Sequence, residues 1–266
     1  MSEYRKWLET IKISWVNLTA YKFNYLLMVL GPSLTFFFVK YNLWTAIYKS
    51  NSLNSIQGYS LSDMLIYQVW TLVVGLLAQS YNSMNIAVDI RYGKISTYLI
   101  YPFDFWQFHT ASFIAFFFNQ IVIAAITVLC MVGLGILAMP SASVLSTALP
   151  LCFLVALLWF VVMYTLGLIA FWLEETWTLR VVFIMISQFF SGSFLPLEIF
   201  PQWLLDGIKY LPFQYMTYVP VKVFMGTYTG SLSLATSVLV FWVFVFATSA
   251  SLIWKRGVKL YTAAGI

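Results

Sequence analysis

The sequence is poor in charged residues, and the shortage excludes an ordinary soluble protein. Of its 266 residues only 9% are Asp, Glu, Lys or Arg, whereas 62% are hydrophobic and 20% are aromatic. Ordinary soluble domains contain about 25% charged residues. A soluble core of this length could not bury so much apolar surface without leaving large exposed patches. The composition therefore predicts a chain whose main solvent is lipid.

Cysteine and histidine are scarce as well. Cys130 and Cys152 both fall in apolar runs, and His109 is the single histidine. No CxxC pair and no Cys/His spacing indicates a metal site, so we expect unpaired, buried thiols and no metal. His109 has no nucleophile and carboxylate placed around it, and we expect it at the membrane interface. We therefore predict no catalytic residue in this chain.

A phosphate-binding loop is also missing from the sequence. The single Gly-Lys pair, Gly93-Lys94, is followed by Ile95 and lacks the upstream glycine of GxxxxGK[ST]. We therefore expect no nucleotide cofactor in this chain. The net charge of +5 does not indicate nucleic acid as a partner, because the basic residues are scattered and form no continuous stripe.

Long uncharged runs separate the few charges that are present. They comprise 25 residues after Asp63, 69 after Asp104 and 32 after Lys222. A helix of 25 residues is about 37 Å long, enough to cross a hydrocarbon core of about 30 Å. The runs are continuous rather than alternating, which favours helices over a barrel. We predict six transmembrane spans, at 23–47, 62–86, 109–137, 146–172, 179–195 and 232–254.

Prolines and glycines mark the expected interruptions of these runs. The run of 69 residues is too long for one helix, and we expect breaks at 139–143 and at Pro150. Gly31-Pro32 predicts a kink in the first span. Neither a repeat nor a flexible linker is visible, so residues 1–266 are expected to form one membrane domain.

The basic residues predict how the chain is oriented. If the N-terminus lies inside, the cytoplasmic segments hold ten Lys and Arg residues and the other side holds four. Lys and Arg concentrate in cytoplasmic loops. We therefore predict that both termini are cytoplasmic, and that residues 87–108 form a cytoplasmic segment.

Residues 3–22 are predicted to form an amphipathic helix ahead of the first span. Trp7, Ile11 and Trp15 recur at helical spacing, and most of the charged residues fall elsewhere on the helix. This pattern is typical of a helix in the membrane interface, with its aromatic residues at the level of the lipid headgroups. A soluble helix that leads into the first span is the alternative.

Two segments do not fit a simple span. In residues 89–102, Gly93 permits a tight turn and Pro102 ends a short helix, which predicts an amphipathic helix on the cytoplasmic surface. An ordinary basic loop is the alternative there. Residues 191–220 hold four of the eight prolines and a ten-residue helical pattern after Pro201. Such a helix is about 15 Å long and cannot cross a bilayer, so we expect a re-entrant segment that caps the spans.

The order of these features resembles the permease subunit of bacterial type-2 ATP-binding-cassette (ABC) exporters, over nearly the whole chain. The resemblance rests on "DIRYGKISTYLIYP" (89–102), "SGSFLPLEIFPQWL" (191–204) with "LP" (211–212), and "FWLEETWTLR" (171–180). It implies an all-α polytopic membrane protein with six transmembrane helices, an N-terminal interfacial helix, a cytoplasmic coupling helix and a re-entrant helical hairpin before the last span.

The resemblance also implies partners and roles for particular residues. ATP and Mg would be bound by a separate ABC ATPase subunit, and a second permease subunit would complete a homodimer or a heterodimer in the bacterial cytoplasmic (inner) membrane. The residues expected to couple to the ATPase are Asp89, Arg91, Gly93, Lys94, Tyr98, Pro102, Glu174, Glu175 and Arg180. The residues expected in a re-entrant gate are Ser191, Gly192, Pro196, Pro201, Trp203 and Pro212.

Some polar residues allow more than one role. Asn119 and Gln120 fall near the middle of the third span, where they would hydrogen-bond between helices or contact substrate in the transport pathway. Glu174, Glu175 and Arg180 would form an internal salt bridge or contact the ATPase. With charge missing from the spans, we expect export of a hydrophobic or amphipathic substrate.

Two other classes of function compete with an exporter. A channel or an ion-coupled transporter would need charged rings, a backbone filter or paired broken helices, and Gly31-Pro32 has no counterpart in a second half. A membrane-embedded enzyme would need a nucleophile, an acid–base pair or a metal facing the interior, and the spans contain no such set.

Overall fold

The computed structural model describes residues 3–20, 22–50, 54–78, 86–100, 103–173 and 175–260, and helices joined by turns and loops make up these ranges. These ranges contain an isolated bridge between Ile56 and Tyr59 and no strand. The long helices are α1 (Glu3–Thr19), α2 (Lys22–Ser50), α3 (Leu61–Ala78), α6 (Phe105–Gly133), α7 (Ala142–Leu168), α8 (Trp177–Phe190) and α12 (Leu232–Leu260). The short ones are α4 (Ile86–Arg91), α5 (Ile95–Ile100), η2 (Ile169–Phe171), η3 (Leu197–Ile199), α9 (Gln202–Ile208), α10 (Phe213–Met216) and α11 (Tyr218–Phe224).

Within the described residues, four helices are long and apolar enough to cross a membrane. They are α3, α6, α7 extended by η2, and α12. The helix α2 matches the first predicted span in position, although several of its side chains lie outside the description. The helix α8 is apolar but has 14 residues, or about 21 Å, which is shorter than a hydrocarbon core of about 30 Å. The predicted count of six is therefore not confirmed.

Several predicted boundaries are wrong. Pro150 does not break the run of 69 residues, since it lies within α7, and the break falls between Gly133 and Ala142. The helix α2 continues through Gly31-Pro32, and the predicted kink at this point stays a prediction. The helix α8 ends at Phe190 rather than at 195, because Ser191 and Gly192 turn the chain away from it. The end of the second predicted span, 79–86, falls largely outside the described residues.

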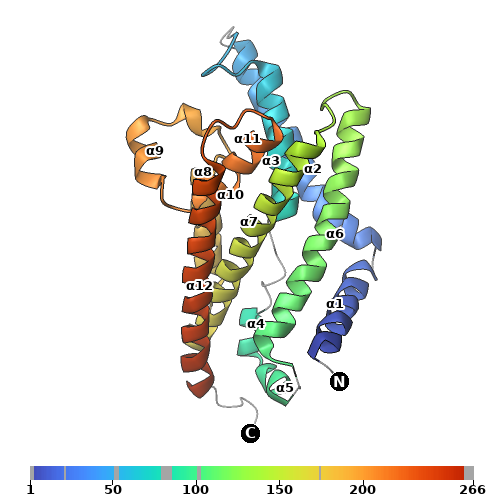
Figure 1. Cartoon of the computed structure of the whole chain (residues 1–266), viewed down its shortest axis with the longest axis vertical. Helices are drawn as coiled ribbons and strands as arrows, with labels where there is room; N and C mark the ends of the chain where they lie inside the picture. The colour runs from blue at the N-terminus through green and yellow to red at the C-terminus, as the bar shows by residue number, and fades with distance from the viewer. Residues whose placement is uncertain are drawn as a thin grey trace.

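The two ends of the molecule carry different segments (Figure 1). The start of α1, the helices α4 and α5 and the end of α12 lie at one end. The helices α9, α10 and α11, together with the connections from α2 to α3 and from α6 to α7, lie at the other. This arrangement agrees with the predicted grouping of both termini with residues 87–108. For clarity we call these the coupling end and the hairpin end.

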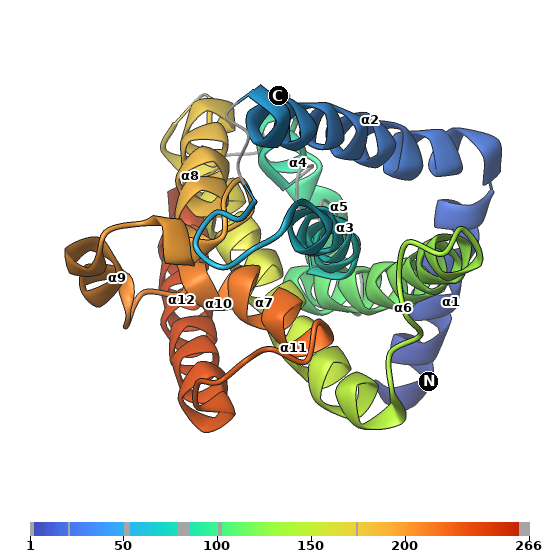
Figure 2. The same cartoon turned by 90° about the horizontal axis from the view of Figure 1, so that it is seen from above.

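The helices α3 and α7 form the centre of the bundle. Most of the side chains in both helices are buried. The helix α12 packs along α7, and α11 lies across α7 and α3 at the hairpin end (Figure 2). Trp70 of α3 stacks on Phe224 of α11, with ring centroids 4.5 Å apart. The packing therefore fixes the second half of the hairpin to the central helices.

The helix α1 lies along the lower part of α6 (Figure 1). Trp7 packs edge-on against Phe103 and Trp106, with ring centroids 5.4 and 6.1 Å away. The Ser14 and Ser112 hydroxyl oxygens are 2.9 Å apart. The predicted helix over 3–22 is thus present as α1, and its aromatic face is packed against α6 near the coupling end.

Candidate functional site

The predicted coupling segment forms two short helices joined by a tight turn. The backbone N–H of Lys94 donates to the Asp89 carbonyl at 2.9 Å, and Gly93 adopts a left-handed φ of +70°. A residue with a side chain is strained in this region, so the glycine is what allows α4 to reverse into α5. Pro102 lies outside the described residues. The prediction of a short helix starting at Ile95 is confirmed by α5.

The charges of this turn are paired with one another. The Lys94 ammonium lies 3.6 Å from the Asp89 carboxylate. Burial raises the pKa of Asp89 above its ordinary value, and the positive charge of Lys94 opposes that rise. The lysine itself is largely exposed. The pair therefore holds the turn together from its outer side.

A second ion pair joins the coupling segment to the connection between α7 and α8. The Arg91 guanidinium donates to the Glu175 carboxylate at 3.0 Å, with both side chains exposed. The backbone N–H of Trp177, the hydrogen bond from Arg91 and the charge of Arg180 lower the pKa of Glu175. Arg180 is buried near the start of α8. Glu174 lies outside the described residues.

The large hydrophobic residues of the coupling segment divide into an inner and an outer set. Tyr98 packs inward on Phe105 and His109 of α6, with centroids 4.9 and 5.9 Å away. Tyr92 and Ile100 point outward and are 70% and 82% exposed. The sequence analysis selected Tyr98 and missed the other two, because periodicity alone did not tell which face the bundle covers.

His109 lies near the start of α6, and its predicted place at the membrane interface stays a prediction. It lies in the second turn of α6 and is buried among aromatic rings, including Phe105 and Tyr164 at 4.4 and 6.0 Å. Aromatic packing therefore accounts for the burial of this polar residue.

Three of the four prolines of the hairpin each precede a short helix, and Pro220 lies within α11. Pro196 precedes η3, Pro201 precedes α9 and Pro212 precedes α10. Proline suits these positions because its fixed φ is compatible with the start of a helix. Trp203 of α9 is 74% exposed, and α9 projects from the side of the bundle (Figure 2). The expectation that the whole segment caps the spans is therefore wrong for α9, whereas α10 and α11 do pack on them.

The turn after α8 is anchored by backbone contacts. The Tyr67 hydroxyl donates to the Gly192 carbonyl at 2.7 Å, and the backbone N–H of Tyr218 donates to the Ser191 carbonyl at 2.8 Å. Gly192 has a φ of +80°. A Cβ atom there would lie 2.9 Å from the Tyr67 hydroxyl and 3.0 Å from the Cβ of Tyr218. The turn therefore requires glycine for both conformation and space.

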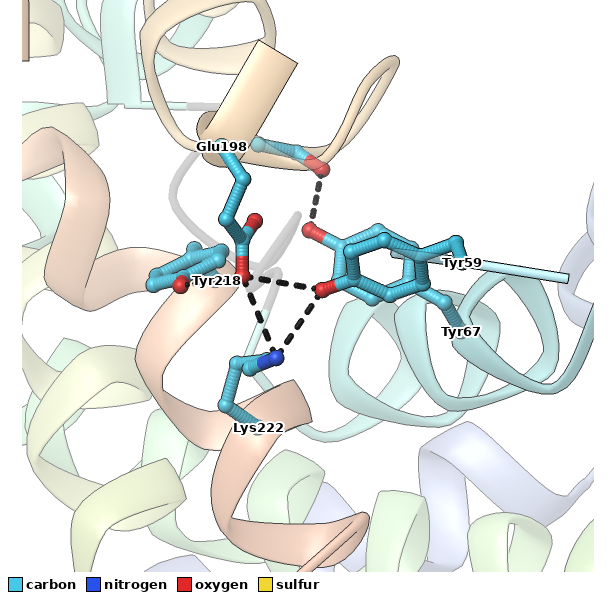
Figure 3. Close-up of polar contacts among 6 residues, drawn as sticks. Tyr59, Tyr67, Glu198, Tyr218 and Lys222 are labelled. Atoms are coloured by element: carbon cyan, nitrogen blue, oxygen red, sulfur yellow. Dashed lines mark hydrogen bonds and ion pairs between the residues drawn. The ribbon is translucent and has the colours of Figure 1, made fainter. Parts of the chain in front are cut away.

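A polar cluster joins the hairpin to the connection before α3 (Figure 3). One oxygen of Glu198, Oε1, accepts hydrogen bonds from the hydroxyls of Tyr59 and Tyr218 at 2.9 and 2.7 Å. The Lys222 ammonium lies 3.1 Å from the same oxygen and donates to the Tyr59 hydroxyl at 2.9 Å. We call Tyr59, Glu198, Tyr218 and Lys222 the hairpin cluster.

The electrostatics of the cluster favour a charged carboxylate. Burial alone would raise the pKa of Glu198, but the hydrogen bond from Tyr218 and the positive charge of Lys222 outweigh it and lower the pKa below its ordinary value. Burial and the negative charge of Glu198 raise the pKa of Tyr59 and of Tyr218, so both hydroxyls keep their protons and donate. The sequence analysis missed this cluster, because its members are up to 163 residues apart.

A second lysine reinforces the hairpin from within the bundle. Lys40 of α2 is buried, and its ammonium donates to the Gln68 side-chain oxygen at 2.5 Å and to the Ser193 carbonyl. The sequence analysis counted Lys40 among the charges on the non-cytoplasmic side. Its contacts connect α2 and α3 to the turn that follows α8.

The candidate pathway residues face the interior of the bundle. Gln120 is buried and donates from Nε2 to the Leu76 carbonyl of α3 at 2.8 Å, as expected for a contact between helices. Asn119 is also buried, and its Nδ2 has no hydrogen-bond partner in the described part of the chain.

Comparison with known proteins identifies the family. No curated protein matches the chain. The family model described as "ABC-2 family transporter protein" matches residues 34–265, which include most of α2, the coupling segment, the hairpin and α12. A match of this extent covers far more than half of the chain. The chain therefore belongs to the ABC-2 family of transporter proteins, as a multi-pass membrane component that associates with an ABC ATPase.

Proposed function

We propose that this chain is the permease subunit of an ABC exporter, which moves a hydrophobic or amphipathic substrate outward across the bacterial inner membrane. ATP and Mg are bound by the separate ATPase subunit, and hydrolysis there drives the movement. Two permease subunits, identical or different, form the translocation unit. Both termini and the coupling end face the cytoplasm.

The observation that carries this proposal is the surface of the coupling segment. Tyr92 and Ile100 are large apolar side chains left exposed at the outer side of α4 and α5. Arg91 and Lys94 lie beside them and are also exposed. Large exposed apolar side chains beside exposed charges are typical of a protein–protein contact. This surface fits a groove on the ATPase better than it fits lipid or water.

The inner side of the segment supports the transmission of force. Ile95 is fully buried, and Tyr98 packs on Phe105 at the start of α6. The helix α4 lies against α7, where a Cβ atom on Gly167 would come within 2.9 Å of Ile86. Since packed elements move together rather than deform, a push on α4 and α5 reaches α6 and α7.

The test is ATPase stimulation by the purified permease in proteoliposomes. Tyr92→Glu places a charge in the proposed contact, and we expect stimulation to fall about tenfold, the range of a lost coupling of 1–3 kcal/mol. Tyr210→Glu is the matched control, because Tyr210 is equally exposed, at 68%, but lies at the hairpin end.

Both variants should insert and purify like the unmodified chain. Normal stimulation by the Tyr92→Glu variant, or an equal loss in the Tyr210→Glu variant, would contradict the proposed docking surface.

A further inference from the structure

A cavity of about 240 Å³ lies near the coupling end, between α6, α7 and α12. It is partly open to the outside of the bundle, and its lining is predominantly apolar. Trp106 of α6, Phe160 and Tyr164 of α7 and Trp254 of α12 supply its aromatic walls. Pockets that enclose drug-sized ligands measure about 300–1,000 Å³. This cavity therefore has room for part of a hydrocarbon chain rather than for a large molecule.

The cavity exists because one face of α12 carries small side chains. Ala247, Ala250 and Ser251 line it, followed by Trp254, at the i, i+3, i+4, i+7 spacing of a single helix face. From Ala247 to Trp254 the helix rises about 10 Å. Since α6, α7 and α12 are each long and apolar enough to span a membrane, a lipid of the leaflet nearest the coupling end is the neighbour expected beside this cavity.

Positive charge stands at the membrane-surface side of this cavity. Lys255 follows Ser251 by one helical turn, on the flank of the face that lines the cavity, and Lys255 is exposed. In the part of the chain that the structure describes, no carboxylate lies within 4 Å of the Lys255 ammonium. A lysine at a span end can extend its ammonium toward the headgroups. The apolar cavity and this cation together match one molecule, with a hydrocarbon chain and an anionic head.

We infer that the cavity binds one acyl chain of an anionic lipid, whose headgroup is held by Lys255 at the surface of the leaflet beside the coupling segment. Trp106 and Trp254, at the ends of α6 and α12, are placed where tryptophan meets the headgroup region. The lipid then stays bound to the permease in that leaflet.

Trp254, which lines the cavity, connects it to the coupling segment. Trp254 stacks on Phe105, with ring centroids 4.7 Å apart and planes within 6°, and Phe105 packs on Tyr98 of α5. A chain that fills the cavity supports Trp254 against this stack. A bound acyl chain therefore holds Tyr98 in position. The permease then couples more strongly to the ATPase in a membrane that contains anionic lipid. This consequence for coupling rests on the proposed function, whereas the binding of lipid does not.

The test uses the purified permease in phosphatidylcholine nanodiscs, with a phosphatidylglycerol analogue that carries a photoreactive group in its acyl chain. Mass spectrometry then locates the cross-linked peptides. We expect labelling of α6 and α12 residues that line the cavity. Ala247→Phe fills the opening and should lower this labelling about tenfold, whereas Thr248→Phe, on the next exposed residue outside the cavity, should leave it unchanged.

The charge is tested with the same probe. Lys255→Glu should reduce the preference for phosphatidylglycerol over the matching phosphatidylcholine analogue about fivefold, the effect of one cation near an anionic headgroup. Arg256→Glu removes an equally exposed cation on the opposite face of α12 and should have a smaller effect. Equal labelling by the two headgroups, or unchanged labelling of the Ala247→Phe variant, would overturn the lipid site.

A separate readout distinguishes this inference from the proposed function. With the ATPase present, stimulation should be higher in phosphatidylglycerol membranes for the unmodified chain and insensitive to headgroup for Ala247→Phe. If the permease stimulates the ATPase equally in both membranes, the link from cavity to coupling segment is wrong. If it never stimulates an ATPase, the proposed function fails, and labelling still decides the lipid site.

Discussion

Glu198 is the residue on which the polar contacts of the hairpin converge. Its Oε1 atom accepts from two tyrosines and lies beside the Lys222 ammonium. Without the Glu198 carboxylate, the Lys222 ammonium would stay charged where water solvates it poorly, and this would cost free energy. The carboxylate therefore matters at the residue scale for the attachment of the hairpin, not for chemistry.

Glu198→Gln should lower the free energy of unfolding by about 1–3 kcal/mol, since a hydrogen-bonded charge is replaced by a neutral amide. The measurement is the thermal midpoint in detergent. Asp206→Asn is the control, because Asp206 is exposed on the same hairpin and contacts Gln202 of its own helix. Equal midpoints for the Glu198→Gln variant and the unmodified chain would contradict this role.

The same carboxylate predicts a dependence on pH. Because the folded chain lowers the pKa of Glu198 below its ordinary value of 4.5, its stabilisation is complete above pH 4.5 and is lost as pH falls through the lower folded pKa. The midpoint of the unmodified chain should therefore fall more steeply below about pH 4.5 than that of Glu198→Gln. If the thermal midpoints of the unmodified chain and of Glu198→Gln changed with pH in parallel, the fold would not stabilise Glu198 in its charged form.

Gly192→Ala should destabilise the turn after α8 by about 1–2 kcal/mol from the left-handed backbone alone, and further from contact with Tyr67 and Tyr218. Gly207→Ala in α9 is the matched control, since a Cβ atom there meets nothing within 4 Å and should be neutral or stabilising. A Gly192→Ala variant as stable as Gly207→Ala would mean that the turn adopts another conformation.

Sequence reasoning at the residue scale found glycines and prolines better than it found side-chain partners. Gly93, Gly192 and Pro201 were identifiable because backbone geometry depends on local sequence. The partnership of Tyr59 with Lys222 was not, since it depends on how α3 and α11 pack. Tyr92 was missed for the same reason, because exposure is set by the neighbours of a helix and not by its own pattern.

Among the elements, the coupling segment and the connection from α7 to α8 act as one surface. Arg91 and Glu175 join them across 84 residues of sequence. Because both side chains are exposed, their salt bridge contributes little to the stability of the fold. Its expected contribution is to orientation, by holding α4 in register with the start of α8.

Reversal of this pair tests that role. Arg91→Glu should reduce ATPase stimulation about two- to fivefold with little change in thermal midpoint, in keeping with an exposed pair. Adding Glu175→Arg should restore part of the loss, because the attraction is rebuilt with opposite polarity. Lys209→Glu, at the hairpin end, controls for a change in net charge. A double variant no better than Arg91→Glu would exclude the pair as the cause.

The long elements followed from the sequence, and their ends did not. Continuous apolar runs fixed the existence of α3, α6, α7 and α12, because a bilayer accepts little else. The helix α8 ended early where tertiary hydrogen bonds to Ser191 and Gly192 replaced helical ones. Pro150 lies beyond the first turn of α7, where proline removes a helical hydrogen bond, and yet the helix continues through it.

For the whole molecule, two polar assemblies lie at opposite ends of an apolar bundle. The coupling segment is tied to α6 and α7, and the hairpin cluster is tied to α3 and α11. The central helices α3 and α7 contact each other and connect both ends. A motion imposed on α4 and α5 therefore has a packed route to the hairpin.

The measurement that tests this account most directly is quantitative mass spectrometry of the chain purified from its native membrane in mild detergent. We predict a stoichiometric ATPase with a GxxxxGK[ST] loop, together with a second permease that is either this chain or a different one. Replacement of Tyr92 by glutamate should remove the ATPase and retain the second permease. Recovery of the chain without an ATPase, together with no binding when the two are mixed, would contradict the account.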